Sequence, residues 1–187
     1  MYDSLLLVVD NGSVYTQSLL DWIKNLDVSF EYHVFSDIPQ LDLGKYSSVI
    51  LSGRRKNNSE MNMINSKLVK HSLGTKKPLL GICYGAEILA LTLGGTIKKM
   101  ASPRHGIHKV QVTKNNPLCS GNIDAFESHS YMISKLGSSF TPLASSTDCK
   151  FEIFQYEDKN IFGTQFHPEM STDGKSLLEK FCNVTQY

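Results

Sequence analysis

The sequence lacks both a strong net charge and long apolar runs. Its 19 Lys and Arg residues nearly balance its 18 Asp and Glu residues, which leaves a net charge of +1. This balance gives no reason to expect binding to nucleic acid or to a membrane surface. The apolar stretches are only as long as a strand, so none is expected to span a bilayer. Met1-Tyr2-Asp3-Ser4 lacks the basic residues that open a secretory signal, and we therefore expect a cytoplasmic protein.

Cysteine is also sparse, and its spacing argues against two kinds of site. The four cysteines, Cys83, Cys119, Cys149 and Cys182, form neither a C-x-x-C metal motif nor the dense pattern of a disulfide scaffold. We expect reduced thiols and no bound metal. The sequence also lacks the G-x-x-x-x-G-K-[ST] loop that cradles nucleotide phosphates. No cofactor is therefore expected in this chain, and an ATP-dependent step would need a separate protein.

What the sequence does contain is an alternation of strand-like and helix-like segments. Its 187 residues, 41% of them hydrophobic, fit a single domain spanning residues 1–187. The patterns predict strands at residues 5–9, 32–35, 48–51, 78–80, 109–113, 125–128, 151–156 and 161–166, and helices at 14–26, 59–72, 86–93 and 173–183. This order predicts an α/β fold with a central, mostly parallel sheet and helices on both faces.

The most informative segment is G-I-C-Y-G at residues 81–85, between a predicted strand and a predicted helix. A cysteine flanked by glycines at such a turn has the layout of a nucleophile elbow, in which the backbone turns sharply and exposes the side chain. The start of the helix behind Cys83 is expected to favour the thiolate. The alternative is a buried cysteine that packs as a small hydrophobic side chain, as most cysteine thiols do.

A second segment supplies the partners that a nucleophilic cysteine needs. The predicted strand at 161–166 is followed by His167, Pro168 and Glu169. Thiol catalysis requires a base within reach of the sulfur and an acid that orients the imidazole. His167 and Glu169 can provide both from one strand end. An isolated histidine would otherwise be interpreted as a polar surface residue.

Together, these segments resemble the class I (triad) glutamine amidotransferase family, whose pattern is G-x-C-x-G followed by F-H-P-E. The resemblance covers essentially the whole chain, because three further stretches fall where the family carries its other signatures: Val9-Asp10-Asn11-Gly12, Ile50-Leu51-Ser52-Gly53 and Ser128-His129-Ser130-Tyr131. The opening D-N-G-x-x-Y, from Asp10 to Tyr15, is most similar to the glutaminase subunit of two-subunit GMP synthases.

The resemblance implies a reaction and a set of site residues. Cys83 would attack the side-chain amide of L-glutamine, and His167, oriented by Glu169, would move the protons. The oxyanion hole would consist of backbone N–H groups of Tyr84 and Gly53. The substrate contacts implied are Gly85, Glu87, Ser130 and Tyr131. The ammonia would pass to a separate ATP-using synthetase subunit, with GMP synthase as the leading candidate.

Two positions depart from the family pattern. After Gly53 the family usually continues with glycine and proline, whereas this chain has Arg54 and Arg55. We expect Arg54 to adopt the glycine conformation only with strain. The basic loop could be displaced until a partner or ligand remodels it, could dock on a synthetase, or could be a solvated loop with no role. Glu87 replaces a glutamine; it could bind the substrate's α-ammonium group or simply favour the helix dipole.

Two neighbouring histidines are a weaker candidate for a functional site. His105 and His108 could suit a metal, but no third ligand is evident, and we interpret residues 103–108 as a loop.

Two further functions remain open: a stand-alone thiol hydrolase or amidotransferase acting on another γ-glutamyl or amide substrate, and a catalytically weak regulatory relative. The altered loop and Glu87 favour these alternatives. The presence of all three chemical groups of the proposed triad argues against the regulatory one.

Overall fold

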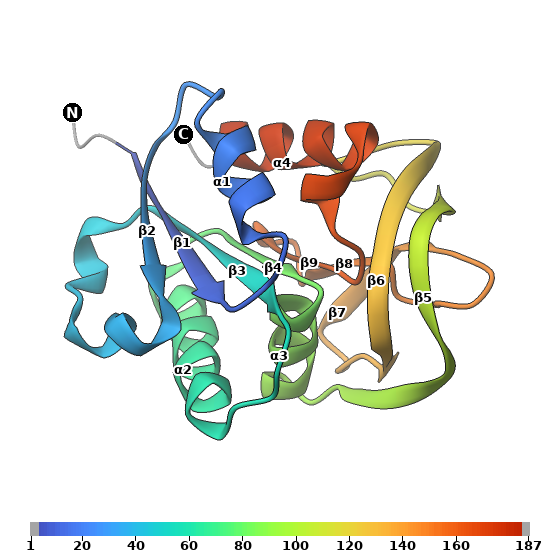
Figure 1. The fold of residues 1–187 in the computed structure, drawn as a ribbon, viewed down its shortest axis with the longest axis horizontal. Coiled ribbons are helices and arrows are strands. Elements are labelled where there is room, and N and C mark those ends of the chain that lie inside the picture. Colours follow the sequence, from blue (N-terminus) through green and yellow to red (C-terminus); the bar gives the residue numbers. More distant parts are fainter. Residues whose placement is uncertain (1–3, 185–187) are drawn as a thin grey trace.

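In the computed structural model, which describes residues 4–184, nine strands form one sheet (Figure 1). The strands are β1 (Leu5–Asn11), β2 (Ser29–Val34), β3 (Ser48–Arg54), β4 (Leu79–Ile82), β5 (Thr96–Val112), β6 (Asn122–Lys135), β7 (Phe140–Ser145), β8 (Ile153–Tyr156) and β9 (Ile161–Thr164). The helices are α1 (Thr16–Ile23), α2 (Ser59–Thr75), α3 (Tyr84–Thr92) and α4 (Thr172–Val184), and short 3-10 turns are η1 (Phe35–Gln40), η2 (Leu43–Lys45) and η3 (Pro168–Met170). The expected domain limits of 1 and 187 lie outside the described residues.

The sheet has a parallel half and an antiparallel half. Its order is β2-β1-β3-β4-β9-β8-β7-β5-β6. The first five strands in this order are mutually parallel, whereas every later pairing is antiparallel. The predicted α/β fold is confirmed, and its parallel strands surround the nucleophile segment. The whole sheet is mixed because the β-rich second half of the chain adds its strands as antiparallel neighbours.

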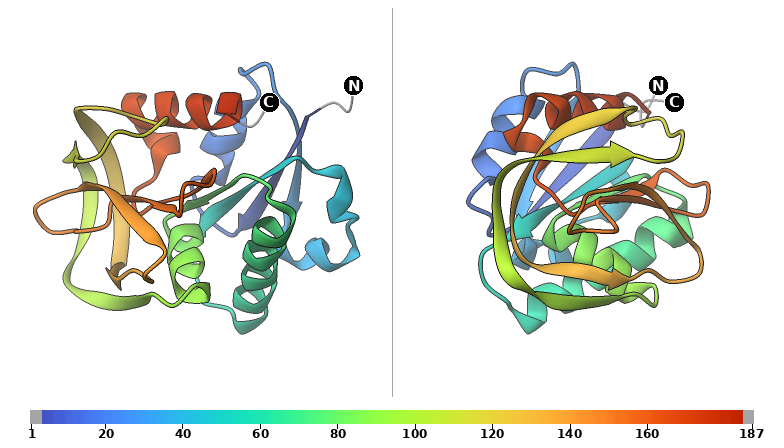
Figure 2. Two further views of the ribbon diagram at one scale, coloured as in Figure 1. Left: turned by 180° about the vertical axis from the view of Figure 1, so that it is seen from behind. Right: turned by 90° about the vertical axis from the view of Figure 1, so that its right-hand side faces the viewer.

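Helices cover both faces of the parallel half, as Figures 1 and 2 show. Along β1, Leu6 and Val8 pack into a core with α1 and α4, whereas Leu7 and Val9 pack into a second core with α2 and α3. Successive strand side chains point to opposite faces, so a strand buried on both sides has no position for a polar residue. This explains the uninterrupted apolar run at the start of the chain.

Helix α1 begins two residues later than predicted because the preceding turn is held by Asp10. Its Oδ1 accepts hydrogen bonds at 2.8 Å from the backbone N–H of Gly12 and at 2.8 Å from Thr16 Oγ1. Gly12 adopts a left-handed backbone with φ +83°. Short polar side chains commonly stabilise such turns by bonding to the backbone two residues on. The turn keeps Tyr15 outside the helix and at the carboxyl end of the parallel strands.

The antiparallel half differs most from the sequence prediction. We expected a strand only at 109–113 and a loop at 103–108, but β5 runs continuously from Thr96 to Val112 and pairs with β6. The loop prediction is therefore wrong. A register shift between Lys99 and Arg104 and a positive φ of +99° at Gly106 accommodate residues that usually end a strand. Strand β7 was not predicted.

None of the helices within residues 4–184 combines the length and the apolar character needed to cross a membrane.

Candidate active site

Cys83 occupies a sharp turn between β4 and α3. Its backbone has φ +49°, which is unusual for any residue other than glycine. The turn is held in place because the N–H of Cys83 donates to the carbonyl oxygen of Thr164 on β9 at 2.7 Å. A strained residue at the carboxyl end of a parallel strand and the start of a helix has the geometry of a nucleophile elbow.

The two glycines that flank Cys83 are required by close packing. A Cβ atom on Gly81 would collide with the carbonyl oxygen of Gly85, and a Cβ atom on Gly85 would collide with the carbonyl oxygen of Leu51 on β3. Helix α3 therefore begins in direct contact with the strands beneath it. The G-x-C-x-G spacing follows from this contact, because only glycine leaves room at both positions.

His167 and Glu169 lie just beyond the end of β9. The backbone N–H of His167 donates to the carbonyl oxygen of Phe126 on β6 at 2.8 Å, which fixes the residue between the two halves of the sheet. Its Nδ1 lies 2.8 Å from Glu169 Oε1. Both side chains are buried. The pairing leaves Nε2 as the nitrogen that is free to exchange a proton with a neighbouring group.

The thiol of Cys83 and the imidazole of His167 interact electrostatically, so each affects the pKa of the other. Burial raises the pKa of the Cys83 thiol, and the positive charge of His167 only partly opposes the rise. Burial also disfavours the charged imidazole, but the negative charges of Cys83 and Glu169 raise the pKa of His167 well above its ordinary value. The expectation that the helix start favours the thiolate of Cys83 stays a prediction, because burial favours the neutral thiol whereas the raised pKa of His167 favours transfer of the proton to the imidazole.

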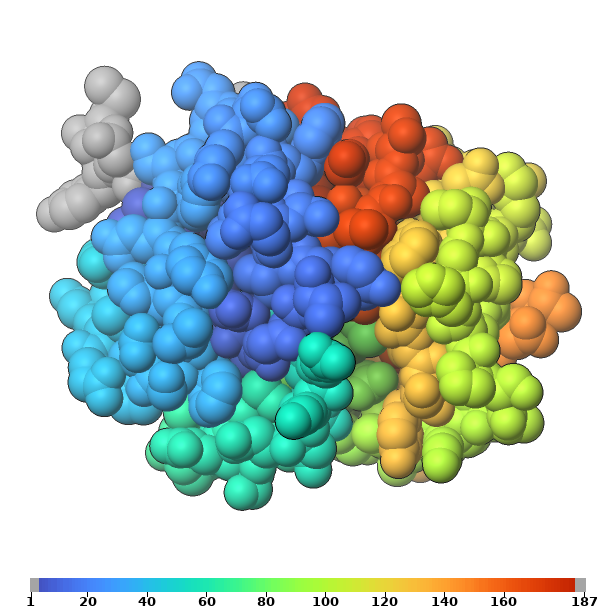
Figure 3. All heavy atoms as spheres, in the orientation of Figure 1, coloured from blue at the N-terminus to red at the C-terminus, as the bar shows by residue number. Residues whose placement is uncertain are grey.

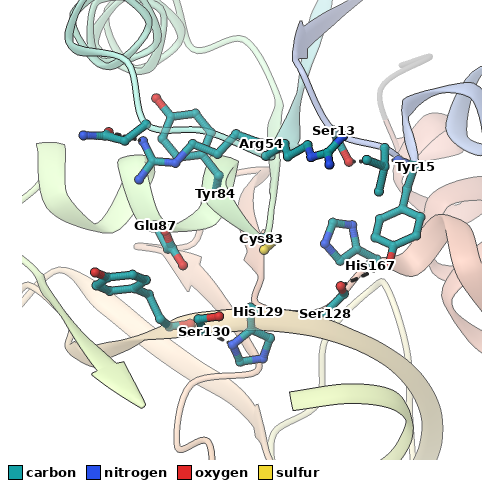
Figure 4. A pocket seen from close by; sticks show the side chains of 14 residues that line it. Ser13, Tyr15, Arg54, Cys83, Tyr84, Glu87, Ser128, His129, Ser130 and His167 are labelled. Carbon is teal, nitrogen blue, oxygen red and sulfur yellow. Dashed lines mark hydrogen bonds between the residues drawn. The ribbon is translucent and has the colours of Figure 1, made fainter. Parts of the chain in front are cut away.

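A cavity of about 560 Å³ opens in front of Cys83. It lies where the N-terminal turn, the loop after β3 and strand β6 meet on the face shown in Figure 3. Its lining residues come from both halves of the sheet: Ser13, Val14, Tyr15, Arg54, Arg55, Asn57, Cys83, Tyr84, Glu87, Ser128, His129, Ser130, Tyr131 and His167. Figure 4 shows that Glu87 and Ser130 lie on one side of Cys83 and that His167 lies on the other.

The two expected oxyanion-hole residues lie close to the reactive pair. Tyr84 is the first residue of α3, so its backbone N–H has no acceptor within the helix. Its phenol donates to Asn62 Oδ1 at 2.8 Å. Gly53 lies against His167: a Cβ atom at this position would lie 2.8 Å from His167 Cε1. Tyr84 is one of the described residues that line the cavity, whereas Gly53 and Gly85 are not.

Arg54 has a different conformation from the one expected. Strand β3 extends through Arg54, which is not among the positive-φ residues of the described chain. The expected backbone strain is therefore absent. Its guanidinium Nη1 donates to Asn57 Oδ1 at 2.7 Å and to Asn62 Oδ1 at 2.9 Å, and its Cζ lies 4.1 Å from the centre of the Tyr84 ring. The arginine is thus a fixed, cationic part of the cavity wall.

Glu87 is 6% exposed and lines the cavity opposite His167. Burial raises the pKa of its carboxyl group. The amide of Gln165 donates to Glu87 Oε1 at 3.3 Å and opposes this rise. The positive charges of Arg54, His129 and His167 act in the same direction. A carboxylate in this position offers a negatively charged contact to a cationic group bound in the cavity.

Ser130 and Tyr131 lie on β6 and line the cavity, as the expected substrate contacts should. Sequence reasoning missed two residues on the same wall. Tyr15 packs edge-on against the imidazole of His167, with ring centres 4.6 Å apart, and its hydroxyl donates to Ser128 Oγ at 3.1 Å. Both residues lie within stretches quoted above for their family likeness, but nothing in the sequence indicated that they touch each other.

Comparison with known proteins shows which family the whole chain resembles. A family model described as glutamine amidotransferase class-I matches residues 7–184. A separate subunit of the glutamine-hydrolyzing GMP synthase of Methanocaldococcus jannaschii is 30% identical over 190 residues, which cover 98% of each chain. The glutamine-hydrolyzing GMP synthase of Citrobacter koseri is 29% identical over 191 residues, which cover 94% of this chain but only 36% of the relative. The chain thus spans little more than a third of such relatives.

Solved structures share the fold. A crystal structure from Thermoplasma acidophilum, provisionally named as a GMP synthase subunit, superimposes with a TM-score of 0.86 at 28% identity, covering 98% of this chain and 94% of the other. A glutamine amidotransferase structure from Thermotoga maritima gives a TM-score of 0.75 at 21% identity, covering 97% and 83%. The second likeness concerns the fold alone.

Proposed function

The chain belongs to the glutamine amidotransferase class-I family, and on this premise we propose that it is a glutaminase subunit. It hydrolyses L-glutamine through Cys83, His167 and Glu169 and passes the ammonia to a separate ATP-using synthetase subunit, that of GMP synthase. The observation that carries the proposal is the strained Cys83 elbow, coupled to a His167 that is hydrogen-bonded to Glu169 at 2.8 Å. The likeness to the Methanocaldococcus jannaschii subunit over 98% of both chains supports a separate synthetase.

The reaction begins when the Cys83 thiol transfers its proton to Nε2 of His167, whose pKa is raised well above its ordinary value by the charges of Cys83 and Glu169. The thiolate attacks the side-chain amide carbon of glutamine. The imidazolium then gives this proton to the amide nitrogen, and the C–N bond breaks to release ammonia and leave a γ-glutamyl thioester on Cys83. Water attacks the thioester, His167 accepts a proton from it and returns this proton to the sulfur, and glutamate leaves.

Backbone N–H groups stabilise the oxyanion that forms in both steps. The N–H of Tyr84 supports this role because it opens α3 without an intrahelical acceptor. A second donor comes from the Gly53 segment, which lies against His167. Loss of one such donor typically costs about 3 kcal/mol of transition-state stabilisation. The conformation of β3 at Gly53 and Arg54 therefore decides how fast the isolated chain works.

The amino-acid end of glutamine binds on the side of the cavity away from His167. Glu87 contacts the α-ammonium group, and the backbone of Ser130 and Tyr131 holds the α-carboxylate. Gly85 contributes by letting α3 begin close to β3, which sets the depth of the cavity.

The direct test is glutamine-dependent ammonia release by the purified chain, with and without the ATP-using subunit of GMP synthase and its nucleotide substrates. We expect Cys83→Ala to abolish the release in both conditions while leaving the fold intact, because a thiol-to-methyl change creates little cavity. Co-purification with the synthetase subunit should accompany stimulation of the wild-type chain. Ammonia release by Cys83→Ala at the wild-type rate would falsify the nucleophile assignment.

One observation favours a second candidate function. Arg54 and Glu87 place a fixed cation and a carboxylate in the cavity wall, where the family usually has glycine and glutamine. These charges suit a stand-alone thiol hydrolase that acts on another γ-glutamyl amide. A substrate panel of L-glutamine, L-asparagine and γ-glutamyl methylamide distinguishes the two functions. Turnover of the methylamide above that of glutamine, unaffected by a synthetase, would establish the second.

A further inference from the structure

A group of buried polar side chains lies behind the cavity wall, under the β5–β6 hairpin. We call it the hairpin cluster: Arg104 on β5, Glu127 and His129 on β6, and Ser146 and Glu152 between β7 and the start of β8. Glu127 and Glu152 are fully buried, and Arg104 and His129 are each 8% exposed. Burial of this many charged groups is costly unless they are paired. The proposed reaction uses none of these side chains.

One side of the cluster joins Arg104 to Glu152. Arg104 Nη1 donates to Ser146 Oγ at 2.8 Å, and Ser146 Oγ donates to Glu152 Oε1 at 2.6 Å. Nη1 also lies 3.7 Å from Glu152 Oε1 and 3.7 Å from the exposed Asp148. The side chain of Glu152 is thereby held by Ser146 and Arg104.

The two carboxyl groups of the cluster differ in their preferred charge. Glu127 Oε1 and Glu152 Oε2 are both buried without a hydrogen-bond partner among the described residues. Burial and the negative charge of Glu127 raise the pKa of Glu152 well above its ordinary value. Burial also favours a higher pKa for Glu127. The hydrogen bond from His129 and the charge of that imidazole outweigh this effect, so the pKa of Glu127 lies below its ordinary value. Glu152 therefore holds the proton, and Glu127 remains an anion that faces His129.

The other side of the cluster ends on the cavity wall. His129 Nε2 lies 2.7 Å from Glu127 Oε2, and Nδ1 lies 2.7 Å from the carbonyl oxygen of Tyr131. A carbonyl oxygen can only accept, so Nδ1 carries a hydrogen, and the Glu127 carboxylate accepts from Nε2. The bond to Tyr131 spans the place where the β5–β6 ladder is interrupted, because the register shifts between Lys99 and Arg104.

From this arrangement we propose that Glu127 and His129 are positioning residues, which hold the Ser130–Tyr131 backbone in the conformation that binds the substrate's α-carboxylate. This role rests on the proposed function, because it concerns the same cavity. The bulge in β5 removes the regular ladder at this point, and the side chain of His129 takes over the task of fixing the strand. Glu127 fixes the imidazole in turn, and its partner Glu152 is held by Arg104 through Ser146.

The charged groups around His129 favour a single orientation of its imidazole ring. Glu127 faces it from its own strand, Arg104 faces Glu152 from β5, and Cys149 lies near Glu127 and Glu152 from the connection before β8. From α3, Glu87 interacts electrostatically with His129 across the cavity wall. The imidazole thus lies between two carboxylates, with its second nitrogen directed at Tyr131.

The test compares two reagents that alkylate Cys83, so it does not depend on turnover or on a synthetase. The chloromethyl ketone analogue of glutamine carries the α-carboxylate, and iodoacetamide does not. The variants are His129→Leu, which removes both hydrogen bonds, and His129→Asn, which keeps a donor at about the distance of Nδ1. The control is His105→Leu, which removes an exposed imidazole from the neighbouring strand β5. Circular dichroism and melting temperature identify a variant that fails to fold.

In His129→Leu, the half-saturating concentration of the ketone should rise by about tenfold or more, as expected when a hydrogen-bonded subsite for a charged group is disordered. The iodoacetamide rate should stay within twofold. His129→Asn should recover most of the ketone affinity, and Glu127→Gln should lose part of it. His105→Leu should behave like the wild type.

Three results would overturn the role. If every folded variant keeps the wild-type half-saturation, or if both reagents slow equally, the cluster supports the fold and does not position the substrate. If His129→Leu cannot be purified in a folded state, the same comparison of the two reagents is made with His129→Asn and Glu127→Gln. If wild-type Cys83 shows no saturation by the ketone while iodoacetamide still labels it, the proposed function fails, and the positioning role fails with it.

Discussion

At the scale of single residues, the proposed chemistry depends on how one proton is divided between Cys83 and His167. Burial raises the pKa of Cys119, Cys149 and Cys182 too, that of Cys182 to about 12. At Cys83, the positive charge of the His167 imidazole opposes the rise. A buried thiol beside a base reacts more readily than one without, because the base lowers its pKa and accepts its proton.

We therefore expect iodoacetamide to label Cys83 before the other three cysteines at neutral pH. Because the thiolate is the reactive form, the rate should rise as pH approaches the raised pKa of Cys83 from below. In His167→Asn, loss of the positive charge should raise this pKa further, move the rate profile to higher pH and slow labelling at about pH 7.5 by about tenfold, the factor for one pKa unit. Mass spectrometry of timed digests measures each site. Equal rates at all four cysteines would argue against an activated thiol.

Arg54 gives a second prediction at this scale. Its guanidinium is anchored to Asn57, Asn62 and the Tyr84 ring, which holds the backbone of β3 extended where the oxyanion hole requires a second donor. Arg54→Gly, alone or with Arg55→Pro and Glu87→Gln, should release this segment. Turnover of glutamine by the isolated chain should rise by about tenfold or more, since one oxyanion donor typically contributes on the order of 10²–10³ in rate.

Steady-state ammonia assays of these variants provide the measurement. Arg55→Gly alone is the matched control, because it also removes one positive charge from the loop. If the unmodified chain by itself already turns over glutamine at about 10 per second, a typical enzyme rate, then the segment is competent as it stands. In that case our explanation of Arg54 is wrong.

At the scale of secondary-structure elements, the position of α3 determines the site. The start of this helix lies so close to β3 that Gly85 has no room for a side chain. Gly85→Ala should push α3 away from the sheet and lower the free energy of unfolding by about 1–3 kcal/mol, as overpacking usually does. It should also lower activity, because the Tyr84 N–H moves with the helix.

The matched control is Gly74→Ala near the end of α2, where a Cβ atom would meet nothing within 4 Å. Alanine is favoured over glycine within helices by up to about 1 kcal/mol, so this variant should be slightly more stable than the wild type. Urea unfolding of both variants gives the two free energies. A loss of stability in Gly74→Ala equal to that in Gly85→Ala would contradict the packing argument.

Elements whose residues follow one clear period could be predicted from the sequence. The apolar run of β1, the strand before Cys83 and helix α2 lie within a few residues of their expected places. Strand β7 was missed because it contains Pro142, which usually excludes a strand, although here it lies at a register shift opposite Phe154. Most of β5 was missed for a similar reason, because Pro103 and Gly106 are accommodated by a bulge.

The candidate site shows the same division. The nucleophile, base and acid candidates could be found because short motifs carry them, and the structure places Cys83 and His167 at one cavity, with His167 bonded to Glu169. Whether Cys83 is charged could not be predicted, because that depends on burial by residues distant in sequence. The contact between Tyr15 and Ser128, 113 positions apart, likewise depends on how the two halves of the sheet meet.

At the scale of the whole molecule, the raised pKa of Glu152 in the hairpin cluster makes stability depend on pH. The folded pKa of Glu152 lies above its unfolded value of about 4.5. The folded state therefore binds more protons than the unfolded state between these two values, and stability falls as pH rises through this interval. Glu127 has the opposite shift, and its contribution is lost as pH falls.

Glu152→Gln removes the first of these effects and keeps the second. Relative to wild type, its free energy of unfolding should increase progressively as pH rises from about 4.5 toward the folded pKa of Glu152, by about 1.4 kcal/mol for each unit crossed. Urea unfolding at a series of pH values measures the difference. A difference between the two proteins that does not change with pH would show that Glu152 is ionised in the folded state.

The place of β9 in the sheet also has a consequence for synthesis. This strand lies between β4 and β8, so Leu79 pairs with Ile161, although the two residues are 82 positions apart in the sequence. A nascent chain that has emerged only as far as β8 leaves β4 as an exposed, unpaired edge, a state prone to association with other chains. A fragment ending at residue 160 should therefore aggregate rather than fold, as measured by light scattering. Cys83 is thus made early, but the cavity around it is assembled only when the last strand has been released.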